Sequence, residues 1–88
     1  MRICYSGKFA REYRKLPPAV KNMAEKKEQI FRQNPFDECL GTHKLKGALK
    51  DFYSFSINNK YRIIFEFISR EESWFHSVGS HSIYGLWD

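Results

Sequence analysis

The chain has 88 residues, of which 42% are hydrophobic and 17% aromatic, and its formal net charge is +5. This length and composition indicate one folded domain, 1–88, with a single modest core, and exclude a disordered tail. The sequence has no signal peptide and no apolar run long enough to span a membrane, and two cysteines make neither a disulfide scaffold nor a metal site. These features favour a reduced, cytoplasmic protein, with a disulfide between Cys4 and Cys39 as the minor alternative.

The positive charge is unevenly distributed along the chain. Residues 1–34 carry nine Lys or Arg against three acids, residues 35–65 carry five against three, and residues 66–88 carry one against four. A basic surplus of this kind attracts nucleic acid or an acidic protein partner. The alternative is a solvated basic helix face that binds nothing.

The first part of the chain has the pattern of a short strand followed by two helices. Met1–Tyr5 reads as the strand, and Ser6 is a suitable N-cap for the first helix. Pro17 and Pro18 end that helix and begin the next, which stops at Asn34. An antiparallel helical hairpin is expected. The predicted apolar stripe comprises Phe9, Tyr13 and Leu16 in the first helix, and Val20, Met23, Ile30 and Phe31 in the second, where the stem of Lys27 interrupts it.

The rest of the chain predicts a long loop and then three strands. Residues 35–51 are expected to form the loop, of a length that is usually functional or mobile. Asn58 and Asn59 suit a tight hairpin turn, because asparagine tolerates positive φ. The expected fold is α+β, a helical hairpin packed on one face of a small, mostly antiparallel twisted sheet. The predicted strands are 52–57, 61–68 and 74–79.

The central predicted strand has two chemically different faces. Its odd positions are apolar and should face the core, whereas Arg62 occupies an even position and should project from the opposite, uncovered face. A guanidinium there is well placed to bind a phosphate with two hydrogen bonds. The alternative is an ordinary surface arginine paired with Glu66, which lies on the same face. The odd positions are Tyr61, Ile63, Phe65 and Phe67.

A second chemically distinctive segment lies in the long loop. His43, Lys44 and Lys46 place one imidazole and two ammonium groups within five residues. Together with Arg62 and His81, such groups could hold a phosphodiester and transfer protons around it. The alternative for each histidine is a surface residue in a loop or turn.

Five segments of the chain occur in a characteristic order and spacing. They are KFAREYRKLPPAV, NPF, HKLKG, FYSFSINNKYRIIF and VGSHSIY. In this arrangement the chain resembles, over nearly its whole length, the RelE/ParE superfamily of toxins from type II toxin–antitoxin systems. The resemblance is nearest to the YafQ-like and YoeB-like branches, whose members are mRNA interferases that cut mRNA, typically in the ribosomal decoding site. ParE-like members lack the catalytic residues and inhibit DNA gyrase.

The resemblance implies roles for individual residues. His43 stands where the nuclease branches have a loop histidine or a glutamate base, and Arg62 matches the arginine that contacts phosphate. His81 matches the C-terminal histidine taken as general acid. Tyr84 resembles the C-terminal tyrosine of RelE-like members, which could stack on a base or assist proton transfer, although the intervening spacing is shorter here.

Further implied contacts concern RNA binding and base preference. Lys44 and Lys46 resemble basic loop residues that hold RNA, and Lys60 is assigned to RNA binding as well. The chain departs from the YafQ-like branch at Ser56 and Lys60, where that branch has a histidine and an aspartate. A second imidazole on the strand is therefore missing, which bears on rate and sequence preference more than on reaction class.

The expected function is that of a metal-independent endoribonuclease toxin that uses no cofactor and acts on mRNA, with the ribosome and a cognate antitoxin as partners. Glu66 ranks below His43 as candidate base, because a carboxylate beside a guanidinium is a poorer base. His76 is expected to be structural. Two alternatives remain open: a ParE-like inhibitor of DNA gyrase, and a basic RNA-binding module without catalysis.

Overall fold

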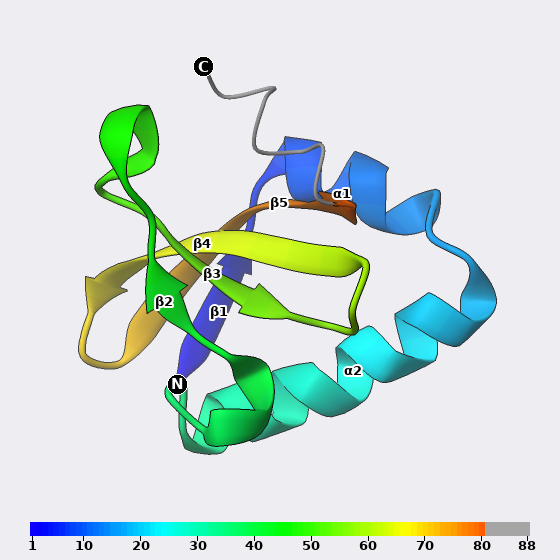
Figure 1. Cartoon of the computed structure of the whole chain (residues 1–88), viewed down its shortest axis with the longest axis horizontal. Helices are drawn as coiled ribbons and strands as arrows, with labels where there is room; N and C mark the ends of the chain where they lie inside the picture. The colour runs from blue at the N-terminus through cyan, green and yellow to red at the C-terminus, as the bar shows by residue number, and fades with distance from the viewer. Residues whose placement is uncertain (81–88) are drawn as a thin grey trace.

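The computed structural model describes residues 1–80, which form two helices and a five-stranded sheet (Figure 1). The α+β class expected from the sequence, with a helical hairpin against a sheet, is confirmed. Two short 3₁₀ turns, Glu38–Leu40 and Gly47–Leu49, flank the second strand. The regular elements are α1 (Gly7–Arg14), α2 (Pro18–Gln33), β1 (Arg2–Tyr5), β2 (His43–Lys44), β3 (Tyr53–Ser56), β4 (Tyr61–Ser69) and β5 (Glu72–Ser80).

The helical hairpin forms where the sequence predicts it. Ser6 caps α1, since its side-chain oxygen accepts a hydrogen bond from the backbone N–H of Phe9 at 2.9 Å. Pro18 lies in the first turn of α2, where a missing N–H leaves no bond unmade. Lys27 does not complete the apolar stripe of α2. Its Nζ donates to the backbone carbonyl of Cys39 at 2.8 Å and so ties the helix to the following loop.

The strand order in the sheet is β1-β5-β4-β3-β2. β1 runs parallel to β5 and the other neighbours are antiparallel, which confirms the mostly antiparallel sheet. The prediction of a structureless loop over residues 35–51 is wrong, because β2 pairs with β3 within it. A two-residue strand is too short to display a period of two in the sequence. Leu40 and Leu49, both buried, anchor the segments on either side of β2.

The turn between β3 and β4 also differs from the prediction. Among residues 1–80 only glycines, Gly41 and Gly47, have positive φ, so the asparagines do not use that conformation. Asn58 instead accepts hydrogen bonds through its side-chain oxygen from the N–H groups of Lys60 at 2.9 Å and Tyr61 at 2.8 Å. The asparagine therefore stabilises the hairpin by capping backbone donors.

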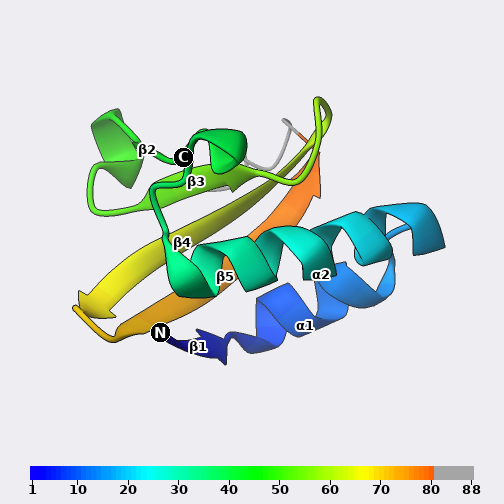
Figure 2. The ribbon, with the colours of Figure 1, turned by 90° about the horizontal axis from the view of Figure 1, so that it is seen from below.

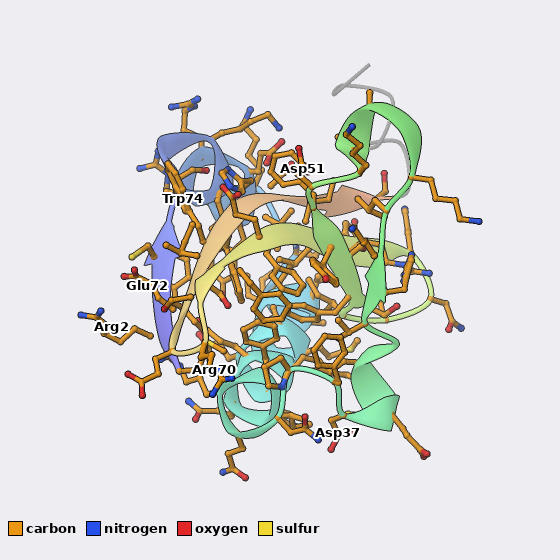
Figure 3. All side chains as sticks on the ribbon, turned by 90° about the vertical axis from the view of Figure 1, so that its left-hand side faces the viewer. Arg2, Asp37, Asp51, Arg70, Glu72 and Trp74 are labelled. Atoms are coloured by element: carbon orange, nitrogen blue, oxygen red, sulfur yellow. The ribbon has the colours of Figure 1, made fainter. Side chains whose placement is uncertain are left out.

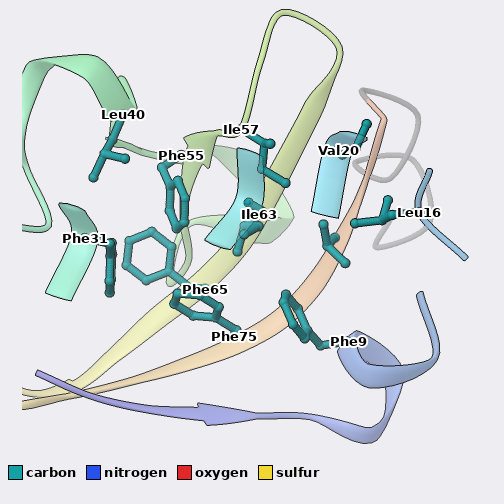
Figure 4. Close-up of a cluster of buried hydrophobic side chains, with 12 residues drawn as sticks. Phe9, Leu16, Val20, Phe31, Leu40, Phe55, Ile57, Ile63, Phe65 and Phe75 are labelled. Atoms are coloured by element: carbon teal, nitrogen blue, oxygen red, sulfur yellow. The ribbon is translucent and has the colours of Figure 1, made fainter. Parts of the chain in front are cut away.

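The two helices pack against one face of the sheet (Figure 2). Phe31 of α2 is fully buried at the centre of the core and contacts the rings of Phe55, Phe65 and Phe75 at centroid distances of 5.1, 4.9 and 5.2 Å (Figure 4). Burial of each such ring contributes about 1.5–3 kcal/mol. The core cluster comprises Phe9, Leu16, Val20, Ala24, Phe31, Leu40, Phe55, Ile57, Ile63, Phe65, Phe75 and Val78.

A β-bulge separates the two halves of the pairing between β4 and β5. Ile64 lies opposite Ser77 and Phe65 lies opposite Phe75, so His76 is an extra residue on β5. The bulge lets Phe75 and Val78 both reach the core, although they are three residues apart. Of the two residues between them, His76 lies on the face away from the helices, which we call the open face, and Ser77 lies at the edge of β5, where its hydroxyl contacts α1.

Two further expectations can be compared with the structure. Cys4 and Cys39 are free and exposed, so the alternative of a disulfide between them is wrong. Within residues 1–80, neither helix has the length and apolar character needed to cross a bilayer.

Candidate functional site

The pairing of β2, β3 and β4 places His43 and Arg62 on the same face of the sheet. His43 lies opposite Ser54, and Ser54 lies opposite Ile64, so these three residues share a face. Arg62 is two residues before Ile64 on β4 and points to the same side. Since Phe65 and Ile63 face the helices, this shared side is the open face.

The separation of His43 and Arg62 follows from the strand register. Two strand spacings across the sheet and two residues along β4 place their Cα atoms about 12 Å apart. Ser54 and Ile64, which lie between them on this face, are fully buried. The ladder agrees with the prediction that Arg62 projects from the helix-free face, and the convergence of His43, Arg62 and His81 on one RNA linkage stays a prediction.

His43 is exposed, and one of its ring nitrogens has a defined partner. Nδ1 lies 3.0 Å from the backbone carbonyl oxygen of Gly41. A carbonyl can only accept, so Nδ1 carries the hydrogen and the neutral ring presents an unprotonated Nε2. Gly41 has φ of +61°, which an L-residue with a side chain adopts only with strain. The turn before β2 therefore selects the tautomer that can take up a proton at Nε2.

The guanidinium of Arg62 lies against the turn between β3 and β4. Its Nη1 donates to the backbone carbonyls of Asn58 and, at 3.1 Å, Tyr61. These bonds hold the planar group, while Nε and Nη2 make no hydrogen bond to any of residues 1–80. The alternative that Arg62 pairs with Glu66 is wrong, because Glu66 binds His76. A pre-oriented guanidinium with unused donors can bind an anion with little loss of side-chain entropy.

The lysines predicted to bind RNA surround this region without converging on one point. Lys44, Lys46 and Lys60 are all exposed. Lys44 lies opposite Tyr53, so it points to the other side of β2 from His43. The Nζ of Lys60 lies 5.5 Å from the ring centroid of Tyr61, next to Arg62. The arrangement provides a positive border on two sides of the open face.

His81 and Tyr84, the other two predicted catalytic residues, lie outside the described residues. Within the described residues, β5 reaches Ser80. Gly79 lies opposite Arg62, and Ser80, the residue before His81, lies opposite Tyr61. Among residues 1–80, no three histidine, cysteine, aspartate or glutamate side chains gather as a metal site would require.

The open face carries a second group of side chains, Glu66 and His76, which the sequence analysis ranked below His43. His76 donates or accepts through Nε2 at 2.8 Å from Oε1 of Glu66, and its ring contacts Trp74 and Phe52 at centroid distances of 4.6 and 5.1 Å. The sequence analysis expected His76 to be structural and did not predict its contact with Glu66. The even position of Glu66 on β4 indicated its face, but the bulge that turns His76 to the same face has no signature in the sequence.

A groove lies on the helical side of the molecule. Its volume is about 420 Å³, and buried residues Phe9, Ala24, Ile63 and Phe75 are among those that line it. Tyr5 stands at its side and donates a hydrogen bond to Glu28. Burial raises the pKa of Tyr5 to about 12, and the bond to Glu28 acts in the same direction. The groove is on the opposite face from His43 and Arg62 and does not belong to that site.

Comparisons with known proteins identify the architecture. No model of a protein family matches the sequence, and no curated protein matches it. YafQ from E. coli is 18% identical and superimposes with a TM-score of 0.78 over 96% of this chain and 98% of its own. The YoeB/ParE toxin from Agrobacterium tumefaciens is 14% identical, with a TM-score of 0.77 over 92% of this chain and 99% of its own.

A third solved structure is the toxin–antitoxin complex RelBE2 from Mycobacterium tuberculosis. Its matching chain is 15% identical, with a TM-score of 0.75 over 91% of this chain and 96% of that one. Identities at this level establish shared architecture and leave activity to be argued from the site. The family resemblance predicted from five sequence segments is thus confirmed for the fold, and the chain has the fold of the RelE-like toxins.

Proposed function

We propose that the protein is the toxin of a toxin–antitoxin pair and cleaves mRNA at the ribosome as a metal-independent endoribonuclease. The observation that carries the proposal is the position of His43 and Arg62 on the helix-free face of a RelE-like fold. A base-competent imidazole and a fixed guanidinium on one face are two of the three groups that such cleavage requires.

The reaction assigns one role to each group. Nε2 of His43 accepts the proton of the ribose 2′-OH as the 2′-oxygen attacks the adjacent phosphorus. Arg62 binds the non-bridging oxygens through Nε and Nη2 and stabilises the charge that develops on them. The bond to the 5′-oxygen breaks, and His81 supplies the proton to that oxygen. The products are a 2′,3′-cyclic phosphate and a 5′-hydroxyl, and no metal or cofactor takes part.

Other residues serve binding. Lys44, Lys46 and Lys60 attract the RNA backbone and raise the rate of encounter with a polyanion. Tyr84 stacks on a base or assists proton transfer. A cognate antitoxin neutralises the protein, and an acidic segment of that partner complements residues 1–34, where nine basic residues face three acids. The protein acts in the cytoplasm, where its substrate is found.

Substitution of Arg62 tests the proposal. Arg62→Ala removes the fixed donor, and we expect a loss of cleavage of about 100- to 1,000-fold. His43→Ala should cost about 100- to 10,000-fold, the range for general acid–base help. Arg70→Ala is the matched control, because Arg70 is exposed at the turn between β4 and β5, at the far end of β4 from Arg62.

The measurement is primer extension on cellular mRNA after induction of each variant, together with growth. Wild-type protein and Arg70→Ala should produce new 5′ ends and growth arrest, and Arg62→Ala should produce neither. Undiminished arrest in both Arg62→Ala and His43→Ala refutes a nuclease. Intact mRNA with induced DNA-damage signalling would assign the protein to the gyrase inhibitors, which share the fold.

A further inference from the structure

The open face carries an exposed aromatic surface far from Arg62. Trp74 is 40% exposed, and one of its neighbours is the ring of His76, at 4.6 Å between centroids and 37° between planes. Phe52 packs edge-on against the same imidazole at 5.1 Å. Phe52, His76 and Trp74 therefore form a short aromatic series that ends at an exposed indole, which lies beside β1 (Figure 3).

Glu66 fixes this series and adds a hydrogen-bond acceptor. It lies opposite Trp74 in the β4–β5 ladder, and its Oε1 is 2.8 Å from Nε2 of His76. Its second oxygen, Oε2, accepts no hydrogen bond from any of residues 1–80, and the side chain is 30% exposed. The indole and the carboxylate thus present a flat apolar surface and an open acceptor side by side.

Charge divides the open face into two chemically different ends. Lys46, Lys60 and Arg62 make the end near β2 and the β3–β4 turn positive. Around Trp74 the carboxylates of Glu66 and Glu72 repel phosphate, and Glu72 is only loosely paired with the exposed Arg2, at 3.8 Å. A single-stranded nucleic acid across this face would therefore place phosphates at the first end and a base at the second.

We propose that Trp74, His76 and Glu66 form a subsite that binds one nucleobase of single-stranded RNA. The proposal rests on the nuclease function proposed above and explains how that nuclease prefers some bases over others. The base stacks on the exposed face of Trp74 and donates an amino or imino hydrogen to Oε2 of Glu66. Adenine, cytosine and guanine carry an exocyclic amino group, whereas the N3–H of uracil lies between two carbonyls that repel a carboxylate. Uracil is therefore the disfavoured base.

The subsite lies within reach of the same RNA strand. Three strand spacings and two residues along the strands separate the Cα atoms of His43 and Trp74 by about 16 Å. The recognised base accordingly belongs to a nucleotide a short distance along the chain from the linkage that is cut, and not to the nucleotides that form it.

The test is the fluorescence of Trp74 in a Trp87→Phe background, which leaves Trp74 as the single tryptophan. The probes are the 2′-deoxy hexanucleotides dA6, dC6 and dU6, which lack the attacking hydroxyl and are not cleaved. We expect saturable quenching, with dU6 binding most weakly. In this background Trp74→Phe should retain the affinity for dA6. Because this variant has no tryptophan, its binding is measured by competition with a fluorescently labelled oligonucleotide. Trp74→Ala should weaken binding of dA6 at least about fivefold, the lower limit for stacking on an aromatic side chain.

Two variants control the interpretation. Phe36→Ala removes an aromatic side chain that is 58% exposed, but on the helical side of the sheet, where it contacts Phe67 and Tyr53, and should leave affinity unchanged. Glu66→Gln keeps the size of the side chain and a carbonyl oxygen for His76 while removing the negative charge. It should reduce the preference for dA6 over dU6 and leave the quenching of Trp74 in place.

The outcomes separate this inference from the nuclease function. Equal affinity of dA6 for wild type and Trp74→Ala overturns the subsite, even if Arg62→Ala abolishes cleavage and so supports the nuclease. Quenching by a tri-arginine peptide but by none of the oligonucleotides also overturns it and assigns the surface to a cationic protein segment. Quenching by dA6 in a protein that arrests growth without cleaving mRNA supports the subsite and refutes the nuclease.

Discussion

Glu12 of α1 joins the helical hairpin to the end of β5, and its removal should measurably weaken the fold. β1 pairs with β5 only as far as Phe75, so the next part of that edge has no strand beside it. There Oε1 of Glu12 accepts hydrogen bonds from Oγ of Ser77 at 2.8 Å and from the N–H of Val78 at 3.1 Å. The carboxylate thus takes the place of a neighbouring strand.

The cost of Glu12→Ala follows from these contacts. Val78 is 2% exposed, so its N–H would lose its partner inside the protein, at about 1–3 kcal/mol. The lost bond to the buried hydroxyl of Ser77 adds about 1 kcal/mol. The ion pair of Glu12 with Lys8, at 2.7 Å, is partly exposed and contributes about 0–1 kcal/mol. The free energy of unfolding should fall by about 2–5 kcal/mol.

Urea denaturation followed by circular dichroism measures this loss, and the melting temperature should fall by about 10–40 °C. Lys8→Ala is the matched control, because it leaves both bonds of Glu12 to β5 and removes the ion pair and the bond from Nζ of Lys8 to Oγ of Ser77, at 3.0 Å. It should cost about 1–2 kcal/mol. Glu12→Gln keeps an acceptor oxygen and should cost less than Glu12→Ala. A Glu12→Ala protein as stable as Lys8→Ala would show that the carboxylate does not secure this edge.

Three further changes test other parts of the structure. Phe31→Ala, at the fully buried centre of the core, should lower the free energy of unfolding by about 3–5 kcal/mol, measured by the same denaturation. Gly41→Ala forces a side chain onto a residue with φ of +61°, and should cost about 1 kcal/mol and reduce cleavage by displacing the carbonyl that orients His43. The pKa of Tyr5 is raised to about 12, above its ordinary value of 10, so its contribution to stability is complete below pH 10 and lost as the pH rises towards 12; Tyr5→Phe should flatten that alkaline decline.

Each of these has an outcome that contradicts the reasoning. A Phe31→Ala protein within 1 kcal/mol of wild type (on the order of the exposed-site range) would mean that the ring cluster is not the core. Unchanged stability in Gly41→Ala would remove the argument from positive φ, and unchanged cleavage would remove the role of the Gly41 carbonyl. Identical alkaline unfolding of wild type and Tyr5→Phe would show that this phenol is not coupled to folding.

Local patterns in the sequence are sufficient to predict most of the elements. The helical hairpin, the Ser6 cap, the break at Pro17 and the face of β4 that carries Arg62 all follow from signals that extend over fewer than ten residues. Two features of the structure differ from the prediction, each for its own reason. β2 is too short for a period to be read, and the hairpin turn depends on the side chain of Asn58 more than on its φ.

Some features of the candidate site can likewise be predicted from the sequence, and others are visible only in the structure. The residue types at His43 and Arg62, and their match to a family pattern, are enough to indicate phosphate chemistry. That Arg62 is held by the Asn58 and Tyr61 carbonyls, and that Glu66 binds His76 and not Arg62, depends on strand register and on one bulge. Neither is encoded in a local pattern, because both arise from pairing between distant segments.

An α+β domain with a basic helical half can be predicted from the amino-acid order alone, since composition, caps and periodicity act over short distances along the backbone. The set of side chains that share the open face depends on contacts between distant segments: the ladder brings His43 level with Ile64, and the bulge turns His76 towards Glu66 and Trp74. The physical reason is that the pairing of strands fixes the position of a side chain relative to residues far away in the chain, and a shift of one residue would reverse its face.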